Sequence, residues 1–207
     1  MTKLLIEPHY LGSIEYFCLL SSFQQVEFEV CDSFQKQTYR NRTLILGANK
    51  VLPLIIPLSY SNHTPTKDVR IDYSQRWIKD HWGAIYSSYG KAPYFEFFSD
   101  EWLKILEGRE HFLVDLLIKF MRLPLKLLNI TLEINFTKSF TSHPAVGFKD
   151  YRNLIQPKID FPNRNIFRPV AYSQLFGDSF VSNLSIIDLI MCEGPRVDEI
   201  VKKSSRL

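Results

Sequence analysis

Short alternating stretches of apolar and polar residues predict β-strands at several places in the chain. Residues 26–30, VEFEV, alternate with a period of two, and residues 130–137, ITLEINFT, repeat the pattern. Strict alternation is typical of a strand with one buried face. Residues 3–8, KLLIEP, predict a third short strand. Two apolar runs joined by Gly-Ala-Asn-Lys at residues 47–50 predict a hairpin.

Apolar residues spaced three and four apart predict helices between and after these strands. The first lies in residues 13–23, where Ser13 is the predicted N-cap. The last is a buried helix in residues 184–192, with Ser182 or Asn183 as its cap and the Gly-Pro pair at 194–195 as its stop. Helical spacing also occurs in residues 74–89, 100–106 and 110–123.

This mixture of strands and helices predicts an α/β fold. We expect a central mixed sheet with helices packed on it, Rossmann-like in outline, with α+β as the alternative. One domain over residues 1–207 is the simplest organisation, because a chain of this length buries a core without metal or disulfide help. Residues 139–178 look irregular and proline-containing. Long irregular stretches in compact chains more often form a site or a lid than a spacer.

Charge and composition narrow the class of protein. A net charge of +3, with acids interleaved among bases, argues against a nucleic-acid partner. No run approaches the ~18 apolar residues of a membrane span, and the N-terminus does not resemble a signal peptide. Three widely spaced cysteines fit a reducing compartment. We therefore expect a cytoplasmic, soluble protein without a membrane span, and the sequence leaves the oligomeric state open.

Several well-known catalytic and cofactor motifs are absent. The chain has no G-x-G-x-x-G, no G-x-x-x-x-G-K-[ST], no G-x-S-x-G and no H-E-x-x-H. Its histidines and cysteines never approach metal-ligand spacing. We predict no metal and no cofactor.

The segment KQTYRNRT, residues 36–43, is the best candidate for binding an anion. If the segment is extended, Arg40 and Arg42 project from one face about 7 Å apart. Two guanidiniums at that spacing suit bidentate contact with phosphate or carboxylate. The alternative is an exposed strand whose arginines pair with acids such as Glu27, Glu29 or Asp32. The residue pattern alone slightly favours that alternative.

Two histidines are candidates for a general acid or base, because the imidazole pKa lies near neutrality. His9 follows a predicted strand and precedes a helix, where α/β sheets place ligand sites. His81 lies in an aromatic helix, with Trp82 on a neighbouring stripe. The alternative to a catalytic role is a structural one: His9 would then be a hydrogen-bonded turn residue, and His81 and Trp82 would lie in the core.

Four long segments resemble the WbqC-like protein family, and the resemblance runs from about residue 4 to residue 195. They are EPHYLGSIEYF (7–17), FQKQTYRNR (34–42), IDYSQRWIKDHWGAIYSSYGKAPYFEFF (71–98) and YSQLFGDSFVSNLSIIDLIMCEGP (172–195). The chain departs from the family pattern at Glu7, where glutamine is usual, and in the step CDSFQ. These departures weaken any role given to Glu7, His9, Asp32 or Phe34.

The resemblance implies a transferase-like protein of surface-polysaccharide (O-antigen) biosynthesis, with acyl or aminoacyl transfer to an activated amino sugar. The alternative is a non-catalytic binding or scaffold protein of the same pathway, so whether the chain is an enzyme stays open. The expected partner is a nucleotide-linked or other anionic sugar. The predicted ligand-binding residues are Lys36, Tyr39, Arg40, Asn41, Arg42, Tyr10 and Trp82, and the predicted catalytic residues are His81 and, less favoured, His9.

Overall fold

A four-stranded sheet lies at the centre of the computed structural model, which describes residues 2–207. Its strands are β1 (Lys3–Ile6), β2 (Gln25–Phe28), β7 (Glu133–Phe136) and β8 (Phe148–Asp150), in the order β7-β2-β1-β8. Every neighbouring pair is parallel. The predicted α/β class is therefore confirmed. The sheet itself is parallel rather than mixed, because the antiparallel pairs form separate ribbons.

Those ribbons are two short hairpins beside the main sheet. The first pairs β3 (Arg42–Leu46) with β4 (Val51–Ile55), and the backbone N–H of Gly47 donates to the Lys50 carbonyl at 3.0 Å to close its turn. This confirms the predicted hairpin. The second ribbon pairs β5 (Leu58–Ser59) with β6 (Arg70–Ile71). Three short 3₁₀ turns are η1 (Thr66–Asp68), η2 (Phe161–Arg164) and η3 (Gly194–Arg196).

Six α-helices surround these strands among residues 2–207. They are α1 (Ile14–Ser21), α2 (Trp77–Tyr89), α3 (Phe95–Glu107), α4 (Leu113–Leu127), α5 (Ile186–Glu193) and α6 (Val197–Ser204). Ser13 caps α1 as predicted, since its hydroxyl accepts the backbone N–H of Tyr16. The predicted caps of α5 are wrong: Ser185 caps it, accepting the N–H of Ile187 at 3.4 Å.

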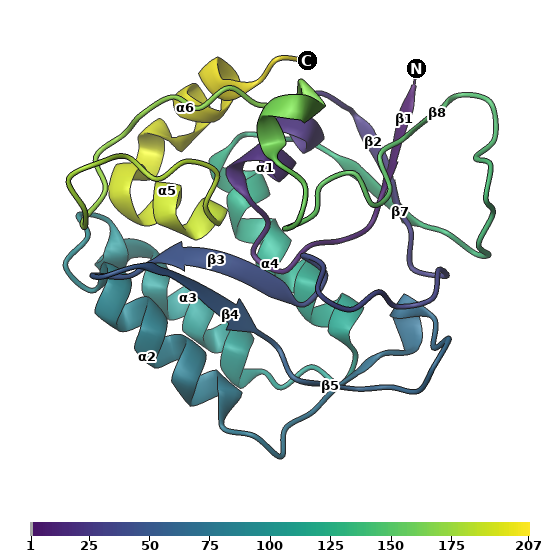
Figure 1. The fold of residues 1–207 in the computed structure, drawn as a ribbon, viewed down its shortest axis with the longest axis horizontal. Helices are drawn as coiled ribbons and strands as arrows, with labels where there is room; N and C mark the ends of the chain where they lie inside the picture. The colour runs from purple at the N-terminus through teal and green to yellow at the C-terminus, as the bar shows by residue number, and fades with distance from the viewer. Residues whose placement is uncertain (1) are drawn as a thin grey trace.

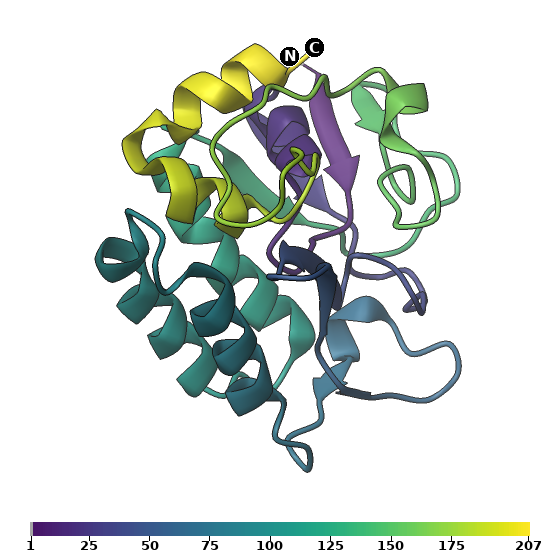
Figure 2. The ribbon, with the colours of Figure 1, turned by 60° about the vertical axis from the view of Figure 1, so that its left-hand side comes forward.

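The helices form two groups (Figures 1 and 2). Helices α1, α5 and α6 lie together near the sheet, and α2, α3 and α4 lie side by side next to the β3–β4 hairpin. On one face of the sheet the two central strands bury Leu4, Ile6, Val26 and Phe28, whereas Phe136 on the edge strand β7 is 43% exposed. Its other face is more polar and borders a hollow of about 440 Å³ beneath residues 137–145.

The parallel arrangement sends the carboxyl ends of all four strands to the same edge. In open α/β sheets, ligands bind in the crevice outside the carboxyl ends of the strands. Here the residues that leave this edge include charged side chains after β1, β2 and β8. No helix among residues 2–207 has the length and apolar character needed to cross a bilayer.

Candidate functional site

A hollow of about 490 Å³ opens at the carboxyl end of the sheet. We call it the carboxyl-end hollow, and it is lined by Cys31, Asp32, Ser33 and Gln35 after β2, by Asp150, Arg152 and Asn153 at and after β8, and by Phe140 and Ser142 between β7 and β8. Its volume lies within the range of small-molecule sites. Seven of its nine lining residues carry polar or charged side chains, which suits a ligand rich in hydroxyl and amino groups.

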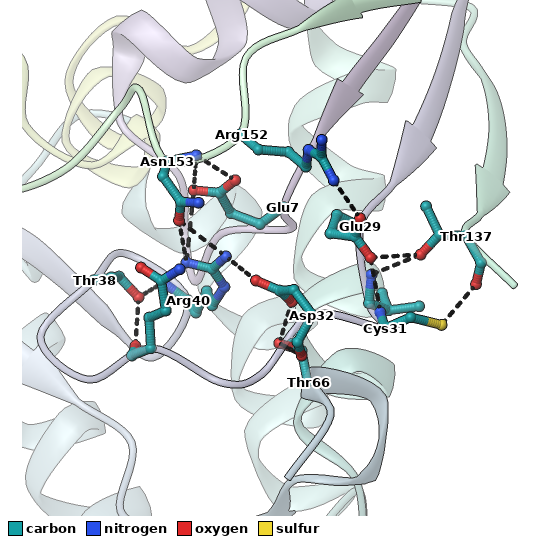
Figure 3. Close-up of polar contacts among 12 residues, drawn as sticks. Glu7, Glu29, Cys31, Asp32, Thr38, Arg40, Thr66, Thr137, Arg152 and Asn153 are labelled. Atoms are coloured by element: carbon teal, nitrogen blue, oxygen red, sulfur yellow. Dashed lines mark hydrogen bonds and ion pairs between the residues drawn. The ribbon is translucent and has the colours of Figure 1, made fainter. Parts of the chain in front are cut away.

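Arg152 holds one wall of the carboxyl-end hollow in place. Its guanidinium donates to both carboxylate oxygens of Asp150, at 3.0 and 2.7 Å. It also donates to Glu29 Oε2 at 2.9 Å (Figure 3). It also donates to the Thr141 carbonyl at 2.8 Å, which fixes the segment between β7 and β8. Bidentate pairs of this kind hold their geometry. The side chain of Asp150 is nevertheless 32% exposed, so it stays accessible to a ligand.

The two carboxylates of the hollow differ in basicity. Burial raises the pKa of Asp32, and the neighbouring Arg40 charge and the Thr66 hydroxyl offset this only in part. For Asp150, burial also acts to raise the pKa, but the hydrogen bonds from Arg152 outweigh it and lower the pKa. Asp32 is therefore the better proton acceptor of the two.

Arg40 lies behind this wall and has no exposed surface. Its guanidinium donates to Asp32 Oδ2 at 2.6 Å and to Asn153 Oδ1 at 3.2 Å, and it lies 3.7 Å from Glu7 Oε1 (Figure 3). The pairing of an arginine of this segment with Asp32 is confirmed, but the exposed strand of that alternative is wrong, because Arg40 is buried. The expected extended conformation is wrong, because residues 37–41 form turns and β3 begins only at Arg42.

Glu7 is the second carboxylate beside Arg40. The backbone N–H of Asn153 donates to both of its carboxylate oxygens, at 3.2 and 3.0 Å. Burial acts to raise its pKa, but the interaction with His9, the Arg40 charge and the Asn153 N–H together lower the pKa to about 2. Glu7 is therefore ionised at neutral pH and balances the charge of Arg40.

His81 is buried, with both ring nitrogens engaged. Nε2 lies 3.2 Å from the Ile55 carbonyl and must donate to it, so Nδ1 accepts from the Tyr10 hydroxyl at 2.9 Å. Burial lowers the pKa of His81 to about 4. A neutral ring engaged at both nitrogens has no free lone pair for a substrate proton. The catalytic role predicted for His81 stays a prediction, and it requires the bond with Tyr10 to break.

His9 is also buried, and its ring stacks on Tyr16 with a centroid separation of 4.2 Å. Burial lowers its pKa, although Glu7 lies 3.6 Å from Nε2 and favours the protonated form. Among the described residues, neither ring nitrogen has a hydrogen-bond partner. Its predicted catalytic role also stays a prediction.

The structure does not bring the other predicted ligand-binding residues into one hollow. Tyr10 is fully buried against His81, and Asn41 donates to the Ile56 carbonyl at 2.9 Å. Lys36 is exposed on a turn, 5.7 Å from the Tyr60 ring. The remaining three are half-buried: Tyr39 with its ring 5.6 Å from that of His9, Arg42 at the start of β3, and Trp82 on α2 beside a different hollow.

Sequence reasoning missed the residues that contribute most to the carboxyl-end hollow, namely Asp150, Arg152 and Asn153. They belong to β8 and the turn after it, a three-residue strand with the sequence FKD. That strand is too short to show alternation. The only available signal was the cluster of charged and amide side chains in KDYRN, within a segment already expected to form a site or a lid. Among residues 2–207, no group of three His, Cys, Asp or Glu side chains is arranged to hold a metal ion.

The model of the WbqC-like protein family matches residues 7–154, which is more than half of the chain. The chain belongs to the WbqC-like protein family. No curated protein and no solved structure matches it. In this WbqC-like protein, the matched part contains the lining of the carboxyl-end hollow on both sides, whereas α5 and α6 lie beyond it.

Proposed function

We propose that this WbqC-like protein binds an activated amino sugar in the carboxyl-end hollow and transfers an acyl or aminoacyl group to the sugar amine, as a step in surface-polysaccharide biosynthesis. The observation that carries the proposal is a hollow with two carboxylates at the carboxyl end of a parallel sheet. The resemblance to proteins of O-antigen biosynthesis supplies the substrate class.

The chemistry of the lining fits an amino sugar. A sugar amine is an ammonium ion at neutral pH, and the partly exposed Asp150 carboxylate is a charged acceptor for it. Gln35, Ser33 and Ser142 offer donors and acceptors for ring hydroxyls. The hydrogen bonds from Arg152 hold the Asp150 carboxylate in a fixed orientation toward the ligand.

The transfer step needs a base, because the bound ammonium must lose one proton before its nitrogen has a lone pair for attack. Asp32 takes this proton, since burial raises its pKa and makes it a stronger base than Asp150. Each carboxylate oxygen of Asp32 already accepts one hydrogen bond and keeps a second lone pair for this proton. In the proposed reaction the amine nitrogen then attacks the acyl carbon of the donor, and the leaving group departs with the electron pair of the bond that breaks and takes up the second nitrogen proton.

The second candidate is a non-catalytic binding or scaffold protein of the same pathway. It is favoured by the burial of Arg40, His9 and His81, three residues expected to serve a reaction. A scaffold would use the hollow for ligand recognition or would leave it unused.

Calorimetry and thermal melting with a nucleotide-linked amino sugar test the proposal. We expect the free amine to bind and to raise the melting temperature, and the N-acetylated and hydroxyl counterparts to bind at least about ten-fold more weakly. Asp150→Asn should weaken binding of the amine by a similar factor. The matched control is Asp100→Asn on the exposed surface of α3, which should bind as the wild type does.

Two outcomes would contradict the proposal. Equal affinity for the amine and its hydroxyl counterpart would remove the recognition role of Asp150. Tight binding of the amine without any acylated product by mass spectrometry, across acyl-CoA and aminoacyl donors, would favour the scaffold.

A further inference from the structure

A second hollow of about 500 Å³ lies between the start of α2 and the end of α3. We call it the Trp82 hollow. The side chains that matter for its chemistry are Tyr73, Arg76, Lys79, Trp82, Glu107 and Arg109. It shares no lining residue with the carboxyl-end hollow, so the two are separate places on the molecule.

Positive charge is concentrated in the Trp82 hollow. Arg76, Lys79 and Arg109 contribute three cations, against one carboxylate from Glu107. Among the described residues, none of these three cations forms an ion pair. By contrast, Arg40 and Arg152 at the carboxyl end of the sheet form ion pairs with carboxylates of the protein. The cations of the Trp82 hollow are therefore free to bind an external anion.

The start of α2 adds to this positive potential. The helix has thirteen residues, and its N-cap, Arg76, makes no capping hydrogen bond. The first N–H groups of a helix carry partial positive charge and favour anions. Asp80 lies in the first turn of α2, but it does not line the hollow.

Aromatic rings supply the other half of the Trp82 hollow. Trp82 is half-buried, so part of its indole stays accessible, and Tyr73 is half-buried beside the same space. The Arg109 guanidinium lies 5.7 Å from the centre of the Tyr73 ring, within the range of a cation–π contact. Cations and accessible aromatic faces together are what a planar or sugar ring with an attached phosphate requires.

We propose that the Trp82 hollow is a binding site for a ring-bearing phosphate ester. The ring stacks on Trp82 or Tyr73, and the phosphate is held by Arg76, Lys79 and Arg109. A nucleoside phosphate and a sugar phosphate share this chemistry. The inference does not depend on the reaction proposed for the carboxyl-end hollow.

Tryptophan fluorescence provides a direct test on the intact protein. The chain has three tryptophans, of which Trp77 and Trp102 are only 4% and 1% exposed, so Trp82 should dominate the response to a ligand. Titration with a nucleoside diphosphate, a sugar phosphate and inorganic pyrophosphate should give saturable quenching by one of the two esters. Trp82→Phe should remove the signal.

Charge reversal identifies the phosphate contacts. We expect Arg76→Glu and Lys79→Glu each to weaken binding at least about ten-fold, and the affinity to fall as salt rises. The matched control is Lys91→Glu, an exposed lysine outside the hollow, which should bind as the wild type does. Far-ultraviolet circular dichroism and thermal melting should show that these variants fold, because Arg76, Lys79 and Lys91 are exposed.

The two esters and pyrophosphate give distinct results. Tighter binding of the nucleoside diphosphate than of the sugar phosphate assigns the ring as a base, and the reverse assigns it as a sugar. Binding of pyrophosphate as tight as that of either ester would overturn the proposal, since the aromatic rings would then contribute nothing. Absence of saturable quenching at millimolar ligand would overturn it as well, as would equal loss of binding in the Lys91→Glu control.

Discussion

Replacing Arg40 with methionine should lower the free energy of unfolding by about 3–5 kcal/mol, the usual cost of removing one partner from a buried ion pair. Arg40 is fully buried between Asp32 and Glu7, and methionine fills much of its volume without its charge. The loss arises because two carboxylates then lie in the interior without a compensating cation. Urea unfolding followed by circular dichroism measures the difference.

Two further variants separate charge from packing at this position. Adding Asp32→Asn to Arg40→Met removes one of the stranded charges, so the double variant should recover part of the lost stability. Arg122→Met, at an exposed arginine of α4, should change stability by no more than about 0.5 kcal/mol. An Arg40→Met protein as stable as the wild type would mean that Arg40 is not the structural cation described here, and would reopen its role in ligand binding.

Acid should destabilise the protein through Glu7. Its pKa is about 2 in the fold against an ordinary value of 4.5, a difference equivalent to about 3 kcal/mol. Because the folded pKa is the lower one, this stabilisation is complete above about pH 5 and is lost as the pH falls toward 2. Between pH 7 and pH 3, the wild type should lose about 2 kcal/mol more than Glu7→Gln does.

The measurement is the free energy of unfolding in urea at a series of pH values. Glu101→Gln, at an exposed position on α3, is the matched control and should keep the pH dependence of the wild type. If Glu7→Gln and the wild type lose stability in parallel, Glu7 does not have the lowered pKa that its contacts with Arg40 and Asn153 imply.

Local patterns were sufficient for the elements whose signals lie within a few residues. The hairpin at Gly47–Lys50 and the Ser13 cap followed from turn and capping chemistry alone. Alternation predicted β2 correctly, with Val26 and Phe28 buried. Helix α3 was predicted at 100–106 but begins at Phe95, because the aromatic run after Pro93 continues the helical face into the core.

Elements that depend on distant partners were not predictable in the same way. Strand β8 has three residues and exists because it pairs with β1. The sequence predicted no helix after the Gly-Pro pair at 194–195, but α6 follows α5 after a single 3₁₀ turn. Arg40 shows the same limit for the site. Its spacing from Arg42 suggested a shared anion-binding face, but a turn at residues 37–41 buries it against Asp32, which precedes it by eight residues.

The position of the first strand has a consequence for how the chain is made. Strand β1 pairs with β2 on one side and with β8 on the other, so Lys3 aligns with Phe148 across the sheet. During synthesis, β1 leaves the ribosome 145 residues before its second neighbour, as counted from Lys3 to Phe148. Strand pairs between residues far apart in the sequence form slowly, and until then the unpaired edge of β1 can pair with other strands and aggregate. We therefore expect one edge of β1 to stay unpaired until residue 150 has emerged, which is the stage at which a chaperone would protect the chain.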